Sequence, residues 1–281
     1  MRQPFAAVVA VAVLAAGAAQ AQNSPAAQRV LDKARAASGG AAGWNMLRGV
    51  HEVGEEGGQP VERWADPLRF GLRQETQTDS GAKLIQGYNG AAEWRILSSG
   101  AATGSDRGPY LAKVRSEAFF SAYGYFYPSR FDLRSSHEGV RQHQGRSYEV
   151  LRMQPAGGAP RDMWFDARTG MLARMIEHDG QGAPETIEVS DYRRVGSVMI
   201  PFRIVTSGGD LTAPRERVLK RVDFQPADRA IFSLPPPAPP KAEPAPPPVA
   251  TPAPPFPLGL LRRRRADMLG GLRTAGPSTR R

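Results

Sequence analysis

The sequence predicts a mainly β fold of the α+β class: a curved antiparallel sheet, or half-barrel, of about eleven strands with two helices, one of them a lid. Between Trp44 and Phe232, apolar residues recur at every second position between glycine-rich turns. This alternation is interrupted once, between about Pro109 and Pro128, by apolar residues three or four positions apart. A long meander with a helix inserted midway favours a curved open sheet over a fully closed barrel.

The first 21 residues have the pattern of a secretory signal peptide. Arg2 precedes an uncharged run over residues 5–16, and Ala19-Gln20-Ala21 forms a small-x-small cleavage pattern before Gln22. The run is too short to span about 30 Å of hydrocarbon. We therefore expect an exported protein, periplasmic or secreted. With no cysteine it has no disulfide, no thiolate metal site and no lipid-anchored Cys.

A first helix is predicted directly after the cleavage site. Ser24 before Pro25 is the cap-then-proline pattern that opens helices. Apolar residues at helical spacing follow until Gly39-Gly40, at Val30, Leu31, Ala34 and Ala37.

The strands are predicted from alternation and from the turns between them. Leu68, Phe70 and Leu72 share one face of a predicted strand, and Trp94 and Ile96 oppose Glu93 and Arg95 in another. The turns contain Gly57-Gly58, Asp79-Ser80-Gly81, Asn89-Gly90, Gly157-Gly158 and Gly208-Gly209. Later strands are expected around residues 148–150, 164–165, 172–176, 187–189, 198–204, 218–224 and 231–232.

The C-terminal part differs in composition from the predicted domain, which covers residues 22–234. Half of the 26 prolines fall within 235–257, so we expect a Pro-rich linker there. Residues 258–281 hold seven arginines and one aspartate and are expected to be a basic disordered tail. The formal charge of +10 is concentrated at this end without interleaved aromatics, which argues against a nucleic-acid partner. An anionic envelope surface is the partner we expect for Arg262, Arg263, Arg264 and Arg265.

Three stretches carry a resemblance to a known family. The first contains residues 36–40 (Ala-Ala-Ser-Gly-Gly), Trp44, residues 62–64 (Glu-Arg-Trp), residues 87–90 (Gly-Tyr-Asn-Gly) and Trp94. The second is residues 122–128 (Ala-Tyr-Gly-Tyr-Phe-Tyr-Pro). The third contains residues 164–172 (Trp-Phe-Asp-Ala-Arg-Thr-Gly-Met-Leu), 190–193 (Ser-Asp-Tyr-Arg), 200–204 (Ile-Pro-Phe-Arg-Ile) and 232–235 (Phe-Ser-Leu-Pro). Together they resemble LolA/LolB-like periplasmic lipoprotein carriers, in particular the LolA-like segment that precedes retropepsin-like aspartic protease domains.

The resemblance implies a half-barrel with a helical lid, a fold that shelters acyl chains of lipoproteins in its best-known members. A protease of the retropepsin type needs paired Asp-Thr/Ser-Gly loops. Asp79-Ser80-Gly81 matches the letters, but polar residues precede it, and a hairpin turn is the better interpretation.

Other catalytic and metal-binding patterns receive little support. The four histidines are His51, His137, His143 and His178, and their spacing forms no zinc motif. His137 and His143 are interpreted as solvated loop histidines, with a weak surface metal site as the alternative. There is no Gly-x-Ser-x-Gly elbow and no phosphate loop. We expect neither a catalytic residue nor a metal or other cofactor.

The large apolar side chains suit either a packed interior or an elongated apolar cavity between sheet and helix. If a cavity exists, the residues predicted to touch its ligand are Phe119, Tyr123 and Phe126 on the helix and Leu72, Trp94 and Ile200 on the sheet.

Three functional hypotheses follow. The first is an exported, non-enzymatic LolA/LolB-like domain that binds an acyl chain, another apolar ligand or an envelope partner. The second is the non-catalytic segment of an aspartic protease family member that lacks the protease domain. The third is a structural envelope module that uses its Pro-rich arm and basic tail.

Overall fold

The structure is a computed structural model, and it describes residues 23–78, 80–127, 130–178 and 183–235. The chain divides into two units, Met1–Pro236 and Pro237–Arg281, and the second lies outside the described residues. The predicted signal peptide, the Pro-rich linker from residue 236 onward, the basic tail and Asp79 also lie outside them.

The described residues form helices α1 (Pro25–Ala37), α2 (Gly40–Asn45) and α3 (Pro109–Ser121) and the 3₁₀ turns η1 (Gly124–Phe126) and η2 (Arg229–Phe232). The strands are β1 (Val50–Glu56), β2 (Gln59–Ala65), β3 (Leu72–Gln77), β4 (Lys83–Tyr88), β5 (Glu93–Ile96), β6 (Ala102–Ser105), β7 (Leu133–His143), β8 (Arg146–Pro155), β9 (Arg161–Asp166), β10 (Leu172–Glu177), β11 (Glu185–Val195), β12 (Val198–Gly208) and β13 (Arg215–Asp223).

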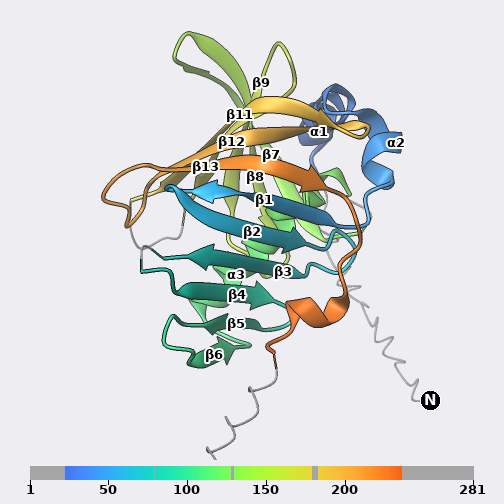
Figure 1. Cartoon of the computed structure of the whole chain (residues 1–281). Coiled ribbons are helices and arrows are strands. Elements are labelled where there is room, and N and C mark those ends of the chain that lie inside the picture. Colours follow the sequence, from blue (N-terminus) through green and yellow to red (C-terminus); the bar gives the residue numbers. More distant parts are fainter. Residues whose placement is uncertain (1–22, 79, 128–129, 179–182, 236–281) are drawn as a thin grey trace, which may run out of the picture. The chain divides into compact units, whose positions relative to one another are not determined.

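Within the described residues all the strands belong to one sheet of 13 (Figure 1). Their order is β6-β5-β4-β3-β2-β1-β13-β12-β11-β10-β9-β8-β7, and every pairing between them is antiparallel. The chain therefore runs along two meanders, β1–β6 and β7–β13, which pairing of β1 with β13 joins into one sheet. The predicted fold class, a mainly antiparallel curved sheet with a helical lid, is confirmed.

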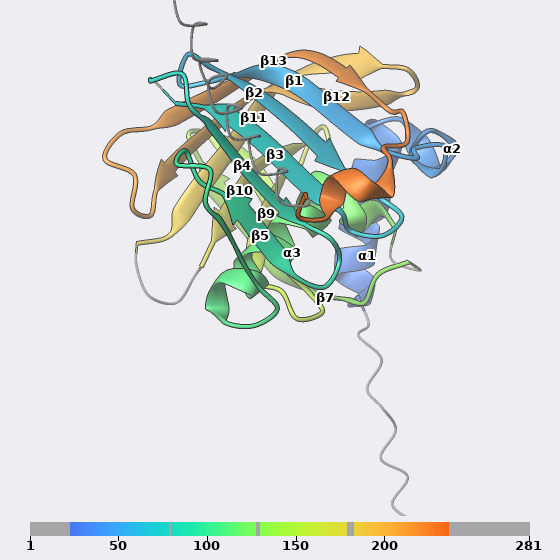
Figure 2. The same cartoon turned by 60° about the horizontal axis from the view of Figure 1, so that its bottom comes forward.

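Helix α3 connects the two edge strands of this order, β6 and β7. The sheet curves around it, and α3 packs against β3, β4 and β8 (Figure 2). A closed barrel would pair β6 with β7, whereas here the helix occupies the open side.

The predicted first helix is confirmed as α1. The Ser24 hydroxyl accepts a hydrogen bond from the amide of Ala27 at 3.2 Å, and Leu31 and Ala34 are buried. Helix α2 was not predicted, because its glycines looked like a helix stop. An ideal Cβ on Gly39 would lie 2.4 Å from the carbonyl oxygen of Ser197, so glycine permits close approach to β12 there.

Two predicted strand segments are wrong. Leu68 and Phe70 lie in a turn before β3, where Phe70 has φ 63° and its amide donates to the carbonyl oxygen of Asp66. Residues 231–232 lie in the 3₁₀ turn η2, capped by the Asp228 carboxylate. The strand count exceeds the prediction because short or polar strands such as β6 and β7 lack apolar alternation.

One end of the interior is packed with aromatic side chains. The Trp44 ring centroid lies 4.8 Å from that of Tyr123 and 4.7 Å from that of Phe126. The Tyr127 hydroxyl donates to the carbonyl oxygen of Trp44, and Phe119 is fully buried beside Phe120. The other end is different, because charged side chains enter it.

Candidate ligand-binding cavity

A cavity of about 350 Å³ lies between α3 and the concave face of the sheet. Its walls come from α3, from β1–β5 and from β9–β13. The volume lies in the lower part of the about 300–1,000 Å³ range of small-ligand sites. Both arms of the sheet thus contribute to one site, and the helix forms its cover.

Part of the wall is apolar. It includes Leu72 of β3, Val114 and Phe120 of α3, Met175 of β10, Ile187 and Val189 of β11, and Ile204 of β12. The strand pairings place Val189 opposite Ile204, and Met175 opposite Ile187. Such directly paired side chains lie about 4.5–5.5 Å apart on the same face of the sheet. These pairs form a continuous apolar strip across β10, β11 and β12.

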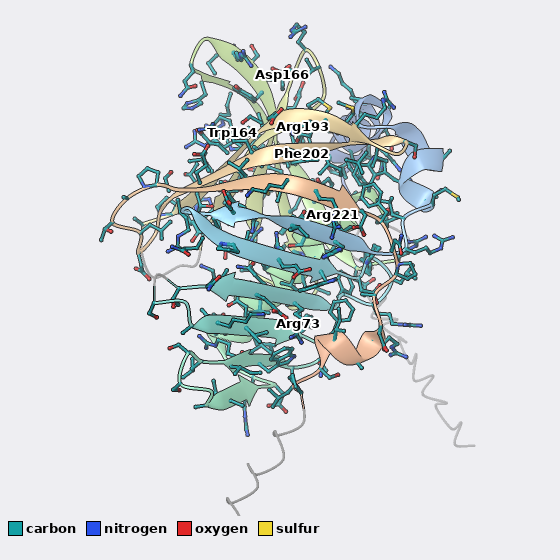
Figure 3. All side chains as sticks on the ribbon, viewed as in Figure 1. Arg73, Trp164, Asp166, Arg193, Phe202 and Arg221 are labelled. Atoms are coloured by element: carbon teal, nitrogen blue, oxygen red, sulfur yellow. The ribbon has the colours of Figure 1, made fainter. Side chains whose placement is uncertain are left out.

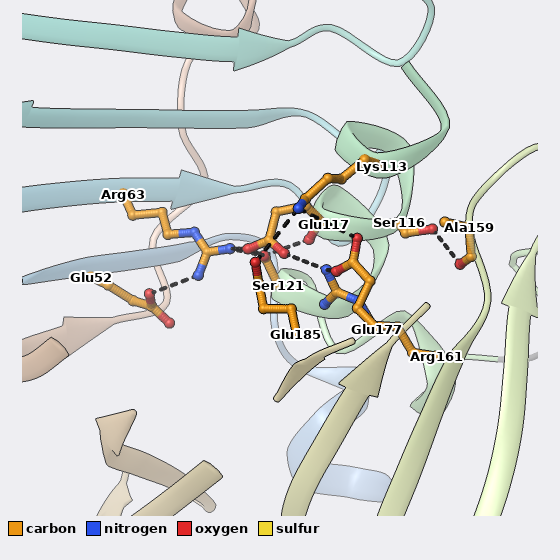
Figure 4. Close-up of polar contacts among 10 residues, drawn as sticks. All are labelled: Glu52, Arg63, Lys113, Ser116, Glu117, Ser121, Ala159, Arg161, Glu177 and Glu185. Carbon is orange, nitrogen blue, oxygen red and sulfur yellow. Dashed lines mark hydrogen bonds and ion pairs between the residues drawn. The ribbon is translucent and has the colours of Figure 1, made fainter. Parts of the chain in front are cut away.

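The rest of the wall is charged and centres on Glu117 of α3 (Figure 4). One carboxylate oxygen of Glu117 accepts a hydrogen bond from Arg63 of β2, and the other accepts one from Arg161 of β9 at 2.7 Å. Arg63 also donates to the Ser121 hydroxyl, and its Nη1 lies 3.6 Å from Glu52 of β1. The carboxylate therefore links the helix to both arms of the sheet.

The network continues to the deep side of the cavity through Arg161 and Glu177, which are among its least exposed members at 3% and 1% of the side chain. Arg161 Nη2 lies 2.6 Å from Glu177 Oε2, and its guanidinium stacks over the Phe120 ring at 4.7 Å. Lys113 Nζ lies 4.0 Å from Glu177 and 3.6 Å from Glu185. Burial of these charges requires such partners.

The electrostatics keep the network ionised. Burial opposes ionisation of Glu117, but the guanidinium groups of Arg63 and Arg161 hold the pKa of its carboxyl well below the ordinary value. Burial alone would lower the pKa of Arg161, yet Glu117 and Glu177 raise it. A carboxylate held in this way does not take up a proton near neutral pH, so Glu117 is unsuited to be a general base.

Arg217 of β13 is less well partnered than Arg63 and Arg161. Its Nη1 lies 3.8 Å from Glu56. Its buried Nε has no hydrogen-bond partner, as in Arg63 and Arg161, but unlike them its side chain forms no other hydrogen bond among the described residues. Burial, and then the neighbouring Arg63, lower the pKa of the Arg217 guanidinium below its ordinary value.

The chain is similar to solved structures of other proteins, but its sequence has no match of the two other kinds compared. No protein-family model and no curated protein matches the sequence. The chain is similar in structure to LolA superfamily protein NE2245 from Nitrosomonas europaea. That match has 12% identity and a TM-score of 0.47 and covers 74% of this chain and 97% of that one.

Two further matches are more distant. A Vibrio parahaemolyticus domain named for outer membrane lipoprotein sorting has 11% identity and a TM-score of 0.44, covering 70% of this chain and 91% of that one. Mycobacterium tuberculosis lipoprotein LppX has 12% identity and a TM-score of 0.31, covering 72% and 98%. The solved structures that are similar to this chain thus include some named for the family that the sequence resembles, and the link to aspartic proteases stays a prediction.

Of the six predicted ligand-contact residues, Leu72, Trp94 and Tyr123 border the cavity. Trp94 does so from an unexpected side. Arg73 pairs with Gly87, and Gly87 pairs with Trp94. Residues paired in this way lie on one face of the sheet, so Trp94 lies on the outer face with Arg73, which is labelled in Figure 3. The indole Nε1 donates to the carbonyl oxygen of Phe232 at 2.7 Å, while Glu93 takes the inner face.

The other three lie in the packed part of the interior. Phe119 and Ile200 are fully buried in the core cluster and do not border this cavity, and Phe126 borders a separate void of about 10 Å³ beside Trp44. The packed interior and the cavity, which the sequence left as alternatives, thus occur together. The expectation of a purely apolar interior is wrong.

The charged residues that sequence reasoning missed are Glu52, Arg63, Glu117, Arg161, Glu177 and Arg217. In β1 and β9 the side chains that face inward include both apolar and charged residues. In β9, for example, Arg161, Met163 and Phe165 all face inward. Alternation alone assigns such charged positions to solvent. The pairs that neutralise them are far apart in sequence, so no local signal could have found them.

The turn and histidine predictions can be placed as well. The described residues of Asp79-Ser80-Gly81 lie between β3 and β4, where the Gly81 amide donates to the carbonyl oxygen of Thr78. His137 and His143 lie on β7 and not in a loop. They bind different partners: His137 Nε2 lies 2.6 Å from Glu149, and His143 Nε2 lies 3.2 Å from Arg174.

The described ranges contain neither a metal-binding cluster nor a membrane-spanning helix. No cluster of three or more His, Asp or Glu side chains suited to hold a metal ion was found there. None of the helices there is long and apolar enough to cross a membrane.

Proposed function

We propose that this chain is an exported, non-enzymatic binding protein that holds an amphiphile in the cavity between α3 and its sheet. The observation that carries the proposal is the divided wall of the cavity, an apolar strip on one side and an ion-paired network on the other. An apolar strip of this kind suits a hydrocarbon chain, which gains about 0.8 kcal/mol per buried methylene. The charged side suits a polar head group.

The state of the charged groups supports binding over catalysis. General acid–base chemistry needs a group whose pKa lies near the working pH. Glu117 is ion-paired by two arginines, and its pKa is far below that range. A network of ion pairs of this kind holds charged side chains in fixed positions, which suits a binding site. It does not activate a nucleophile.

The test fills the cavity. Val114→Trp places a large ring on the cavity face of α3, and Val140→Trp makes the same change on β7, where Val140 is 56% exposed. We expect the wild-type protein and V140W to displace a fluorescent fatty acid probe equally well. V114W should lose the binding, with circular dichroism confirming that both variants fold.

Native mass spectrometry of protein purified from its own envelope provides a second, independent readout. A lipid-sized mass should accompany the wild-type protein and be absent from V114W. If the wild-type protein neither binds the probe nor carries such a mass, the proposal is wrong.

A further inference from the structure

Arg217 lies at the cavity wall, and its side chain has few polar partners. Within the described part of the chain its side chain forms no hydrogen bond, and its ion pair with Glu56 spans 3.8 Å. Only 17% of its side chain is exposed. Glu56 is shared, because Arg215 Nη1 lies 3.5 Å from its other carboxylate oxygen. A guanidinium group has five N–H donors, and leaving them without acceptors in a buried position is unfavourable.

The other buried arginines of the cavity differ in this respect. Arg63 and Arg161 each donate a hydrogen bond to the Glu117 carboxylate. Although burial opposes it, Glu117 and the neighbouring glutamates raise the pKa of both guanidinium groups. For Arg217, burial and the nearby Arg63 lower the pKa. The geometry and the electrostatics agree that Arg217 is weakly partnered: among the described residues its ion pair is with Glu56, which is distant and shared with Arg215.

Each acid of the cavity wall pairs with at least one basic side chain. Glu117 has Arg63 and Arg161, Glu177 has Arg161 and Lys113, and Glu52 has Arg63. Glu93 lies on β5, with four strands between it and β13, and it pairs with Arg95 at 3.8 Å. A cationic group placed beside Arg217 would be repelled, whereas an anionic group would complete its hydrogen bonds.

An apolar path starts at this guanidinium. The pairings set Arg217 of β13 opposite Ile204 of β12, and Ile204 opposite Val189 of β11. All three border the cavity, and Ile187 and Met175 extend the path onto β10. A head group at Arg217 would therefore leave its chain lying along apolar side chains.

The size of the cavity limits the chain. The cavity volume of about 350 Å³ lies near the lower end of the about 300–1,000 Å³ range of small-ligand sites, which suits one hydrocarbon chain of medium length.

We infer that the cavity selects a single-chain amphiphile with an anionic head group, carboxylate or phosphate, which binds Arg217 while its chain follows Ile204 and Val189. This inference rests on the proposed function and names the class of ligand that the function would serve.

The experiment compares head groups on one chain. The affinities of dodecanoate, dodecyl phosphate, dodecanol and dodecylamine for the exported protein are measured by calorimetry, with inorganic phosphate as a chain-free anion. We expect the two anionic ligands to bind about 10-fold or more tightly than dodecanol, the effect of one hydrogen bond to a charged group. Arg217→Gln should remove this preference, so that the acid, the phosphate and the alcohol bind the variant with similar affinity.

Arg203→Gln is the matched control, because Arg203 is exposed and pairs with Glu216 away from the cavity. It should keep the wild-type preference. Since the Arg217 side chain forms no hydrogen bond among the described residues and its ion pair with Glu56 is long, we expect Arg217→Gln to fold. If it does not fold, the comparison of head groups on the wild-type protein still decides.

The outcomes separate the two proposals. Equal binding of acid and alcohol, or tighter binding of dodecylamine, would overturn the inference and leave the proposed function standing. Inorganic phosphate that binds as tightly as dodecyl phosphate would show a simple anion site and also overturn it. Absence of binding by all four amphiphiles would overturn both.

Discussion

Glu117 joins three parts of the molecule through a single side chain. Its carboxylate contacts Arg63 in the β1–β6 meander and Arg161 in the β7–β13 meander, while its own backbone belongs to α3. Those two arginines lie 54 and 44 positions away in the sequence. The side chain is still 33% exposed, because it faces the cavity.

We predict that Glu117→Gln destabilises the protein by about 2–3 kcal/mol at pH 7. Removing one member of a buried ion pair costs about 3–5 kcal/mol, and partial exposure reduces the effect. Unfolding in urea, followed by circular dichroism, measures it. Glu216→Gln, which breaks an exposed pair with Arg203, should change the free energy of unfolding by about 0.5 kcal/mol or less. Equal effects of the two substitutions would contradict the assigned role of Glu117.

The same substitution should change the response to acid. The pKa of Glu117 in the folded protein lies below its ordinary value of 4.5. Its contribution to stability is therefore complete above about pH 4.5 and is lost as the pH falls further toward the folded pKa. As the pH falls from about 5 to about 3, the free energy of unfolding should therefore fall more steeply for the wild type than for E117Q. Parallel curves would show that Glu117 is not held ionised.

At the level of elements, the sequence predicted the positions of most strands. It was less successful in predicting which side chains of each strand face the interior. In β5 the predicted alternation is correct, but Glu93 points inward and Trp94 outward. The reason is tertiary: η2 covers the outer face near Trp94, and a charged cavity receives Glu93. Neither partner lies nearby in the sequence, so a rule that places tryptophan inside and glutamate outside fails.

Helix α3 shows the same limit. Its helical spacing predicted one apolar face, yet Ser116 is fully buried and donates to the carbonyl oxygen of Ala159 at 2.7 Å, and Glu117 lies over the cavity. The sheet curves around this helix, so polar side chains must find partners in strands instead of solvent. The site residue Tyr123 was predicted from the aromatic run of residues 119–127. It lies beyond the end of α3, at the start of η1, where its backbone is left-handed with φ 54°.

Gly87 tests the outward position of Trp94. An ideal Cβ on Gly87 would lie 2.3 Å from Cζ2 of the Trp94 indole. We predict that Gly87→Ala destabilises the protein by about 1–3 kcal/mol, because the indole must move away from its hydrogen bond to Phe232. In a Trp94→Leu background the same change should cost at least about 1 kcal/mol less, which a double-mutant cycle measures. Additive effects would mean that the glycine is required for another reason.

For the whole molecule, the cavity and the basic end of the chain suggest separate tasks. The charges of the cavity wall nearly cancel, because six glutamates face five basic side chains there. The net charge of +10 therefore arises largely elsewhere, and residues 258–281 contribute seven arginines against one aspartate. A protein that delivers or collects an amphiphile at an anionic membrane would benefit from such a segment, because attraction to the surface adds to binding in the cavity without competing for it.

We predict that the full chain binds vesicles containing anionic phospholipid and that changing Arg262, Arg263, Arg264 and Arg265 together to Gln weakens this binding by at least 10-fold. Each basic residue near such a surface contributes about 1 kcal/mol, and four of them exceed the 1.4 kcal/mol that corresponds to one order of magnitude. Co-sedimentation measures the effect, which should fade as salt screens the surface. Vesicles without anionic lipid are the control, and binding of dodecanoate should be the same in both proteins. If the four substitutions leave vesicle binding intact, the basic segment is not a membrane contact; if they also weaken dodecanoate binding, the two tasks are not separate.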